Sequence, residues 1–339
     1  MNIPPGKLPP GLLNRLLKKY ALPAPGVVVG PGIGLDAAVV DAGIPGEYLI
    51  LKTDPITLVG EDIGFYAVNI NANDIACMGG TPRWFTAAVI LPEGRADEAL
   101  VESIFRSLSE TCASIGVSLT GGHTEITHGI DRPIIVGNLT GTVPRDGLKT
   151  AAGVQPGDSI ILTKGIAIEA VSIIAREKRA ELLQAYPREF VERCAGYIRE
   201  PGISVVKDAR IAVEAGEVHA LHDPTEGGLS SGLYEMAEAA GVRLVIDAER
   251  IPVLPEAAEL LGRYRLDALG TIASGALLIA APEGEAEKIV QALQAEGIPA
   301  SRIGSASKGE KGVALLKGGA SLDFPKLERD EITKIFSLL

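Results

Sequence analysis

Acidic side chains recur where strand-like or glycine-rich segments end. Asp36 follows a glycine-rich loop, and Asp54 ends the apolar run 48–53. Asp223 follows a short strand-like run and precedes the helical pattern 229–240. A single carboxylate in such a place is most often a helix cap or a solvated turn. As a set, carboxylates at strand ends beside Gly-Gly pairs are typical of a hard-cation site that holds a polyphosphate, because Mg²⁺ shares its oxygen shell with phosphates.

A second polar cluster interrupts the middle of a predicted helix over 62–78. Asn and Asp compete for backbone hydrogen bonds and are poor residues for a helix interior. Four of them fall within six residues of this helix: Asn69, Asn71, Asn73 and Asp74. Asn71 and Asp74 are three residues apart, so they share a face. Such a cluster requires a partner outside its own helix.

Two Gly-Gly pairs lie beside candidate polar residues. Gly121-Gly122 precedes His123-Thr124-Glu125 in an expected turn after the strand-like run 117–120, and Gly227-Gly228 opens the helix that begins near 229. Glycine-rich turns and helix N-termini offer N–H groups to phosphates without a Walker lysine. The chain has no P-loop motif, and its G-x-G-x-G stretch at 30–34 is not the dinucleotide fingerprint.

Other catalytic patterns are weak in this sequence. The stretch 228–232 matches the G-x-S-x-G nucleophile elbow, but no histidine follows His222, so the order Ser, acid, His is impossible. His123 and His128 are five residues apart, whereas the zinc motif H-E-x-x-H requires four. His219 and His222, if on a strand, point to opposite faces. These spacings favour core or surface histidines over a zinc site.

Composition places the chain among globular proteins and excludes several classes. Its 339 residues, 46% hydrophobic and 22% charged, predict two domains with real cores. A net charge of −11 argues against a nucleic-acid or anionic-membrane binder. The three cysteines are too dispersed for a disulfide framework or a C-x-x-C metal pair. With no long apolar run and no signal-peptide pattern, we expect a cytoplasmic protein without a membrane span.

Strand-like and helical patterns alternate along the chain, which predicts a mixed α/β class. The expected strands are 37–40, 48–53, 84–91, 134–143, 158–163, 242–247, 275–280 and 313–316. The expected helices are 62–78, 96–115, 166–178, 182–195, 204–215, 229–240 and 285–295, after a short amphipathic segment around 12–17. Residues 26–34 are expected to form a loop. The turn-rich stretch 144–157 is the predicted domain boundary.

These motifs, in this order, resemble the superfamily of aminoimidazole ribonucleotide (AIR) synthetase, selenophosphate synthetase, thiamine-monophosphate kinase and the hydrogenase-maturation HypE proteins. The segments that carry the resemblance are GLDAAVV at 34–40, KTDPIT at 52–57, AVNINANDIACMGGTPRWF at 67–85, GGHTE at 121–125 and LHDPTEGGL at 221–229. The last segment is most similar to the HypE pattern. The resemblance covers roughly residues 32–319.

The resemblance implies an N-terminal segment (1–35) and two domains of the AIR synthetase type (36–147 and 156–330). The N-terminal halves of two subunits are expected to pair into a β-barrel, giving a homodimer with ATP in a cleft beside it. By resemblance, Asp36, Asp54 and Asp74 hold Mg²⁺ and phosphates with support from Asn73. The phosphates are expected to contact Gly121, Gly122, Thr124, Asp223, Gly227 and Gly228.

Two departures from the family pattern leave the activity open. Leu35 replaces one residue of the usual aspartate pair, and the sequence ends in Phe-Ser-Leu-Leu where HypE ends in a carrier cysteine. We therefore expect ATP-dependent activation of an amide or carbonyl oxygen on an unknown acceptor, with Asp54, Asp74, His123 and Asp223 as catalytic candidates. The alternatives are a kinase of the thiamine-phosphate type and a non-catalytic nucleotide-binding module. Another maturation-type protein is a further expected partner.

Overall fold

The computed structural model describes the chain apart from residues 1–7, 23, 33, 58, 328 and 337–339. The chain forms two compact units. The small unit contains residues 23–30 and 36–148, and the large unit contains residues 1–22, 31–35 and 149–339. The chain passes from the small unit to the large one between Leu148 and Lys149.

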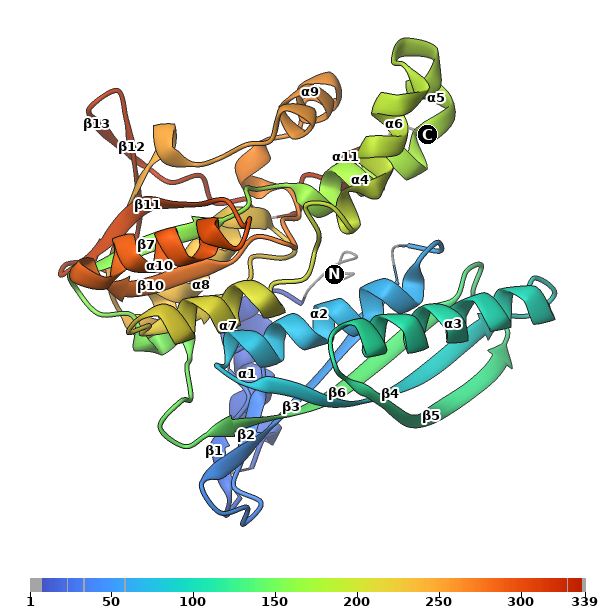
Figure 1. Cartoon of the computed structure of the whole chain (residues 1–339), viewed down its shortest axis with the longest axis horizontal. Coiled ribbons are helices and arrows are strands. Elements are labelled where there is room, and N and C mark those ends of the chain that lie inside the picture. The colour runs from blue at the N-terminus through green and yellow to red at the C-terminus, as the bar shows by residue number, and fades with distance from the viewer. Residues whose placement is uncertain (1–7, 23, 33, 58, 328, 337–339) are drawn as a thin grey trace. The chain divides into compact units, whose positions relative to one another are not determined.

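The small unit is a six-stranded sheet with two helices on one face (Figure 1). The strands run in the spatial order β1-β2-β3-β6-β4-β5, and only β4 and β5 are parallel to each other. The strands are β1 (Val27–Val29), β2 (Ala38–Val40), β3 (Glu47–Ile56), β4 (Thr81–Pro92), β5 (Ser118–Thr127) and β6 (Ile134–Pro144). The helices are α2 (Ile63–Cys77) and α3 (Glu98–Ser114).

Alternation along the strands of the small unit determines which side chains meet the helices. In β3, Ile50 and Ile56 are buried, whereas Leu51 on the other face is 37% exposed. In β4, Phe85 is buried and Trp84 is 44% exposed. The buried set packs against α2, which is apolar around most of its circumference and nearly all buried. The sheet therefore has one covered face and one face that carries exposed apolar side chains.

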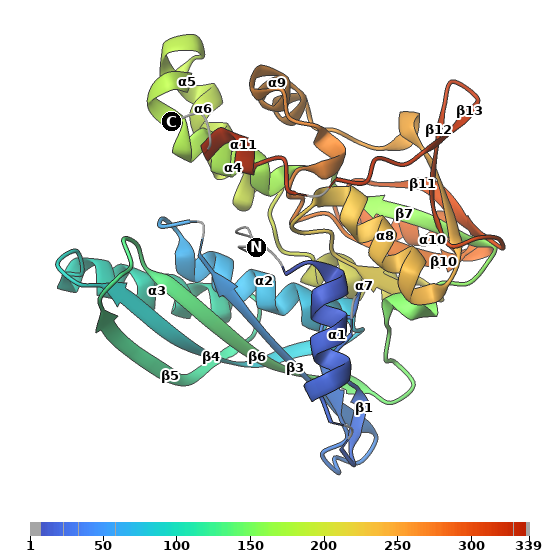
Figure 2. The ribbon, with the colours of Figure 1, turned by 180° about the vertical axis from the view of Figure 1, so that it is seen from behind.

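The large unit is a seven-stranded sheet in the order β13-β12-β9-β11-β7-β10-β8. Helix α8 lies on one face, and α7 and α10 lie on the other (Figures 1 and 2). The strands are β7 (Asp158–Thr163), β8 (Ala220–His222), β9 (Arg243–Asp247), β10 (Leu278–Pro282), β11 (Ala300–Ser307), β12 (Gly312–Lys317) and β13 (Ala320–Asp323). The helices are α1 (Pro10–Tyr20), α4 (Ile168–Glu177), α5 (Arg179–Ala185), α6 (Arg188–Ala195), α7 (Val206–Ala215), α8 (Gly228–Ala240), α9 (Pro255–Tyr264), α10 (Glu283–Ala295) and α11 (Thr333–Phe336).

The mixed α/β class is confirmed, and most predicted elements are found. One predicted loop and one predicted helix are wrong. The valines at 27–29 form β1 on the edge of the small sheet, where a loop was expected. The helix expected over 182–195 is two helices, because Pro187 cannot continue α5. Strands β11 and β13 and helix α9 were not among the expected elements.

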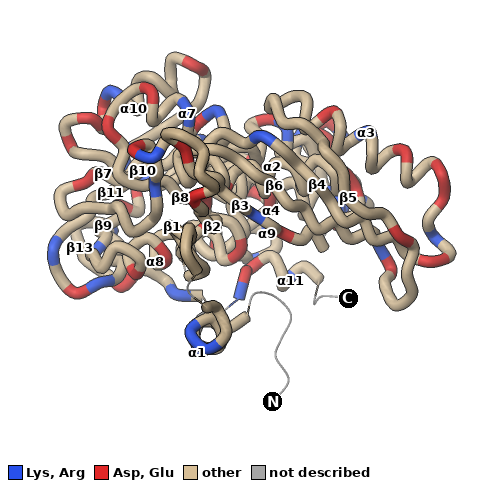
Figure 3. Tube along the Cα trace, turned by 90° about the horizontal axis from the view of Figure 1, so that it is seen from below, with Lys and Arg blue, Asp and Glu red and all other residues tan. Residues whose placement is uncertain are grey.

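Charge is spread over both units. Acidic and basic positions are interspersed along most elements (Figure 3). Helix α1 differs, because it carries Arg15, Lys18 and Lys19 and no acidic residue. Among the residues that the structure describes, no helix has the length and apolar character needed to cross a membrane.

Candidate functional site

Lys52 of β3 links two of the predicted carboxylates, Asp54 of the same strand and Asp74 of α2. Its Nζ lies 3.1 Å from an oxygen of Asp54 and 3.1 Å from an oxygen of Asp74. Side chains two residues apart on a strand point to the same face, and Ile50 and Ile56 on that face are buried. Lys52 and Asp54 therefore face the helix that carries Asp74. The structure thus brings these two carboxylates to one cationic group.

Lys52, Asp54 and Asp74 form an ion triad that is partly shielded from water. The side chain of Lys52 is 17% exposed, that of Asp74 is 10% exposed and that of Asp54 is 36% exposed. Burial works to lower the pKa of Lys52, but the charges of Asp74 and Asp54 outweigh it, so the pKa is raised. Lys52 is therefore a cation throughout the physiological pH range.

Asn71 of α2 connects the helix to the strand beneath it. Its Oδ1 accepts a hydrogen bond from the backbone N–H of Asp54 at 3.0 Å, and its Nδ2 donates to the carbonyl of Ala67 at 2.8 Å. Asn69 donates to the carbonyl of Phe65 at 2.9 Å in the same way. The partner that Asn71 requires outside its helix is thus the backbone of the candidate ligand Asp54. This bond fixes the backbone position from which the Asp54 side chain extends.

A glycine opposite Asp54 makes room for this amide. A Cβ added to Gly137 of β6 would lie 2.4 Å from Nδ2 of Asn71, so no larger residue fits without a shift. Gly137 pairs with Asp54 on one side and with Ala87 on the other, and Ala87 pairs with Gly122. At strand spacings of about 4.8 Å, Gly122 lies roughly 14 Å from Asp54 across the sheet. Gly122 and Asp54 therefore lie in the same row of the sheet, but they are too far apart to contact the same metal ion.

The predicted turn around Gly121-Gly122 is wrong, because both residues lie inside β5 together with His123 and Thr124. The parallel pairing with β4 continues through them after a register shift, and both glycines have φ near +150°. A Cβ at Gly122 would lie 2.0 Å from the carbonyl oxygen of Ala87, so the close approach of the two strands requires glycine. All but the last residue of this strand are exposed.

The remaining predicted residues of the small unit are Asn73, Asp36 and His123, which lie on three different segments. Asn73 is fully buried in α2, next to Asp74. Asp36 is partly exposed in the segment before β2. In β5, Nε2 of His123 lies 3.4 Å from a carboxylate oxygen of Glu125, and both side chains are largely exposed.

Three predicted residues, Asp223, Gly227 and Gly228, belong to the large unit. Asp223 follows β8 and is 3% exposed. The neighbouring His222 is also buried, and its Nε2 lies 3.0 Å from a carboxylate oxygen of Glu235 on α8. This segment therefore holds its charged groups inside the protein.

The N-terminus of α8 receives an acid from the end of the chain. Asp330 accepts hydrogen bonds from three backbone N–H groups: Gly227 at 2.7 Å, Ile272 at 3.1 Å and Ile332 at 2.8 Å. Burial raises the pKa of Asp330 although these N–H groups work to lower it. A carboxylate here also interacts favourably with the positive end of the helix dipole. The N–H of Gly227 thus already has an anionic acceptor in this structure.

A further buried acid, Glu169 of α4, lies in the same region of the large unit. Burial raises the pKa of Glu169 to about 7, and although Ser274 works to lower it, the charges of Asp330 and Asp223 add to the rise. A raised pKa in a buried acidic group is one feature of functional sites, but it also occurs in structural clusters. Glu169 lies in a helical pattern of the sequence that carries no local sign of a site.

The other two histidines have separate carboxylate partners. Nδ1 of His219 lies 2.9 Å from Asp158, and Nδ1 of His128 lies 2.6 Å from Glu93. Each of these two histidines thus lies within hydrogen-bonding distance of a carboxylate.

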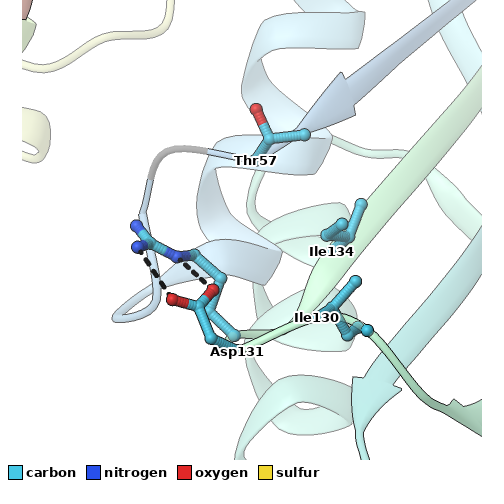
Figure 4. A pocket seen from close by; sticks show the side chains of 6 residues that line it. Thr57, Ile130, Asp131 and Ile134 are labelled. Carbon is cyan, nitrogen blue, oxygen red and sulfur yellow. Dashed lines mark hydrogen bonds and ion pairs between the residues drawn. The ribbon is translucent and has the colours of Figure 1, made fainter.

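A hollow of about 440 Å³ lies where β3 ends and β6 begins (Figure 4). It is lined by Thr57, Gly129, Ile130, Asp131, Arg132 and Ile134. Arg132 and Asp131 pair with each other at its rim, at 3.2 Å. None of the predicted site residues lines this hollow, so it gives no support to the candidate site.

Sequence reasoning missed Lys52, Gly137, Glu169 and Asp330 as site components. A signal existed for Lys52, because a lysine within an apolar strand, two residues before Asp54, must share the face of that carboxylate. Gly137 also had a signal, as a glycine inside a run of β-branched residues. Asp330 had none, since its contacts with Gly227 and Ile272 are to residues far away along the chain.

Comparison with known proteins defines the class to which this fold and these residues belong. The family model for AIR synthase related protein, N-terminal domain, matches residues 34–143, and that for the C-terminal domain matches residues 155–317. Together they match most of the chain. The chain therefore belongs to the AIR synthase related protein family.

Within this family, the relatives and solved structures identify the chain as a HypE-like protein. A putative hydrogenase expression/formation protein of Methanocaldococcus jannaschii is 31% identical over 88% of each chain. The carbamoyl dehydratase HypE of Rhodobacter capsulatus is 31% identical over 86% of each chain. A chain of the crystal structure of a HypE-HypF complex matches over 93% of this chain and 99% of its own, with a TM-score of 0.76 and 22% identity.

Two further solved structures of the same fold carry nucleotide or nucleotide-like ligands. HypE in complex with ATP matches 94% of this chain and 96% of its own, with a TM-score of 0.72 and 23% identity. AaThiL complexed with AMPPCP and TMP matches 94% of both chains, with a TM-score of 0.72 and 19% identity. At these identities the structural likeness shows the two-domain fold.

Proposed function

We propose that this chain binds Mg-ATP and uses it to activate an amide or carbonyl oxygen by phosphoryl transfer. The observation that carries the proposal is the pair Asp54 and Asp74, whose carboxylates converge on one cation. Asn71 also fixes the backbone of Asp54. The carbamoyl dehydratases among its relatives and the HypE structure with ATP support the same chemistry.

The donor set fits a divalent cation of the Mg²⁺ type. Carboxylate oxygens are the ligands that Mg²⁺ prefers, and Asp54 and Asp74 already share a cation, the ammonium of Lys52. We assign Asp36, Asp54 and Asp74 as the metal ligands, with Asn73 in support. When bound, Mg²⁺ supplies neutralising charge at the phosphates.

Phosphoryl transfer requires that the protein position the nucleotide and the acceptor oxygen in line. We assign contacts with the phosphates to the following residues: Gly121, Gly122, Thr124, Asp223, Gly227 and Gly228. Among these, Gly227 donates its N–H to Asp330 here, so a phosphate at this position would compete with that carboxylate. His123 and Asp223 stay candidates for moving the amide proton.

The oxygen that accepts the phosphoryl group belongs to another molecule or group. It does not belong to an acyl or carbamoyl group carried on a cysteine of the sequence shown. Cys77, Cys112 and Cys194 are all buried. Burial raises the pKa of Cys112 to about 11 and that of Cys194 to about 12, which suppresses the thiolate. None of the three is therefore suited to carry an acyl or carbamoyl group.

A kinase acting on a small phosphorylated substrate is the second candidate function, because AaThiL with AMPPCP and TMP shares the fold. The two functions differ in the product. A kinase leaves the phosphoryl group on its substrate, whereas amide activation releases inorganic phosphate together with a dehydrated product.

We also infer that the small unit pairs with a second copy of the chain. Its uncovered sheet face and the edge strand β5 expose Leu51, Trp84, Leu119 and Ile126, the last to 62%. Closing the sheet with a second copy would bury these side chains and remove the edge. A stable monomer at micromolar concentration, by light scattering, would exclude this assembly. The HypE-HypF structure supports a second maturation-type protein as a further partner.

The proposed function is tested by calorimetric titration with ATP, ADP and AMP, with and without Mg²⁺, beside a phosphate-release assay. Mg²⁺-dependent binding of ATP with release of phosphate only when a primary amide is added supports amide activation. Phosphate retained on thiamine phosphate identifies the kinase. Binding without turnover under every condition identifies a nucleotide-binding module, and no binding at all refutes the proposal.

A further inference from the structure

The ammonium of Lys52 occupies the position between two carboxylates that a metal ion would be expected to share. Both Nζ–oxygen distances are 3.1 Å, so neither carboxylate is favoured. The lysine stem lies on the covered face of the small sheet, and its side chain is only 17% exposed. Strand β3 fixes the backbone of Lys52, and the two carboxylates hold its ammonium at the far end of the side chain.

A divalent cation and this ammonium compete for the same oxygens. A hard cation such as Mg²⁺ or Mn²⁺ needs carboxylate oxygens at close range. The negative charge of these oxygens must not already be balanced by another cation. Two positive centres a few ångströms apart repel each other strongly when water is partly excluded. Free metal therefore meets both an occupied pair of ligands and a fixed positive charge.

We propose that Lys52 is the residue that sets the metal requirement of this site: it holds Asp54 and Asp74 together as a built-in cation and keeps free divalent metal out of the pair. Metal then binds appreciably only when it brings further negative charge with it, as a metal–polyphosphate complex does. This last step rests on the proposed function, whereas the exclusion of free metal does not.

The direct test is a titration with Mn²⁺ alone, without nucleotide, followed by electron paramagnetic resonance of the free ion. The wild-type chain is expected to show no saturable site at Mn²⁺ concentrations below several millimolar. Lys52→Met removes the charge but keeps the stem, and we expect it to bind one Mn²⁺ at least ~10-fold more tightly than the wild type. Equal Mn²⁺ binding by both proteins overturns the proposal.

Two further variants identify the cause of any gain in Mn²⁺ affinity. Lys52→Arg keeps a positive charge between the carboxylates, so it should exclude Mn²⁺ as the wild type does. Lys52→Met combined with Asp54→Asn lacks one of the proposed ligands and should lose the gained site. Tight Mn²⁺ binding by either variant contradicts the role given to the charge or to the pair.

Lys52→Met also leaves two carboxylates facing each other, which can prevent folding. If this variant does not fold in metal-free buffer, Mn²⁺ or Mg²⁺ should restore its fold at low millimolar concentration, as seen by circular dichroism. Failure of metal to restore the fold overturns the proposal as well.

The experiment separates this proposal from the proposed function. If the wild type binds no ATP but Lys52→Met gains the Mn²⁺ site, the role of Lys52 stands and the nucleotide function is refuted. If the wild type binds Mg-ATP and Lys52→Met gains no Mn²⁺ site, the nucleotide function stands and the role of Lys52 is refuted.

Discussion

Two acidic clusters, one in each unit of this protein, stabilise their carboxylates by different means. In the small unit Asp54 and Asp74 share the ammonium of Lys52. In the large unit Asp330 is held by three backbone N–H groups, and Glu169 is fully buried. A side-chain cation can be displaced by another cation, whereas backbone N–H groups that are fixed by the fold cannot move away. The first arrangement is therefore suited to binding, and the second to holding the fold together.

The largest expected effect comes from removing the acceptor that joins the end of the chain to α8. Asp330→Ala leaves three N–H groups without this acceptor and takes an anion from the helix N-terminus. We expect a loss of about 4 kcal/mol in the free energy of unfolding, measured with urea. Asp330→Asn keeps an acceptor oxygen and should lose less.

Asp323→Ala is the matched control for this change, because Asp323 is exposed in the same C-terminal region. It should stay within about 0.5 kcal/mol of the wild type. If the two alanine variants lose the same stability, the bonds to Asp330 do not hold this segment in place.

The next effect concerns the buried acid Glu169. Its pKa is about 7 in the folded chain, above the value near 4.5 of an exposed glutamate, so the folded state binds the proton more tightly. Its contribution to stability is therefore complete below pH 4.5 and is lost as the pH rises through 7, by a few kcal/mol at most. Glu169→Gln cannot ionise and should show a flatter fall in unfolding free energy between pH 5 and 7.5.

Glu177→Gln provides the comparison, since Glu177 is exposed at the end of the same helix. Its pH profile should follow that of the wild type. A Glu169→Gln profile that is parallel to the wild-type profile would show that Glu169 does not titrate in this range.

The sequence predicted the parts of the small unit that depend on local pattern and left out those that depend on pairing. The apolar run of β3 and the amide cluster of α2 were recognisable locally, and the cluster indicated that it needs a partner outside its helix, but not that this partner is the backbone of Asp54. The strand assignment of Gly121 and Gly122 could not be predicted, because a Gly-Gly pair is locally a turn and only the close approach of Ala87 makes it a strand. The contact of Asp330 with Gly227 spans over a hundred residues and has no local signal.

The smallest expected effect in free energy, and the one that bears most on function, concerns the carboxylates of the ion triad. Asp54→Asn and Asp74→Asn should each weaken Mg-ATP binding by at least ~10-fold, about 1.4 kcal/mol, measured by calorimetric titration. Each change removes an anionic oxygen from a hard-cation site, so the phosphate charge is less well neutralised.

The structure alters what these variants should do without nucleotide. Carboxylates that repel each other would make the nucleotide-free protein more stable when one is removed. Because Lys52 lies between them, each variant instead leaves a largely buried ammonium with one carboxylate fewer. We expect melting temperatures to fall, more for Asp74→Asn than for Asp54→Asn, since Asp74 is the more buried. A rise in both melting temperatures would show that repulsion dominates, and an unchanged ATP affinity would refute the site.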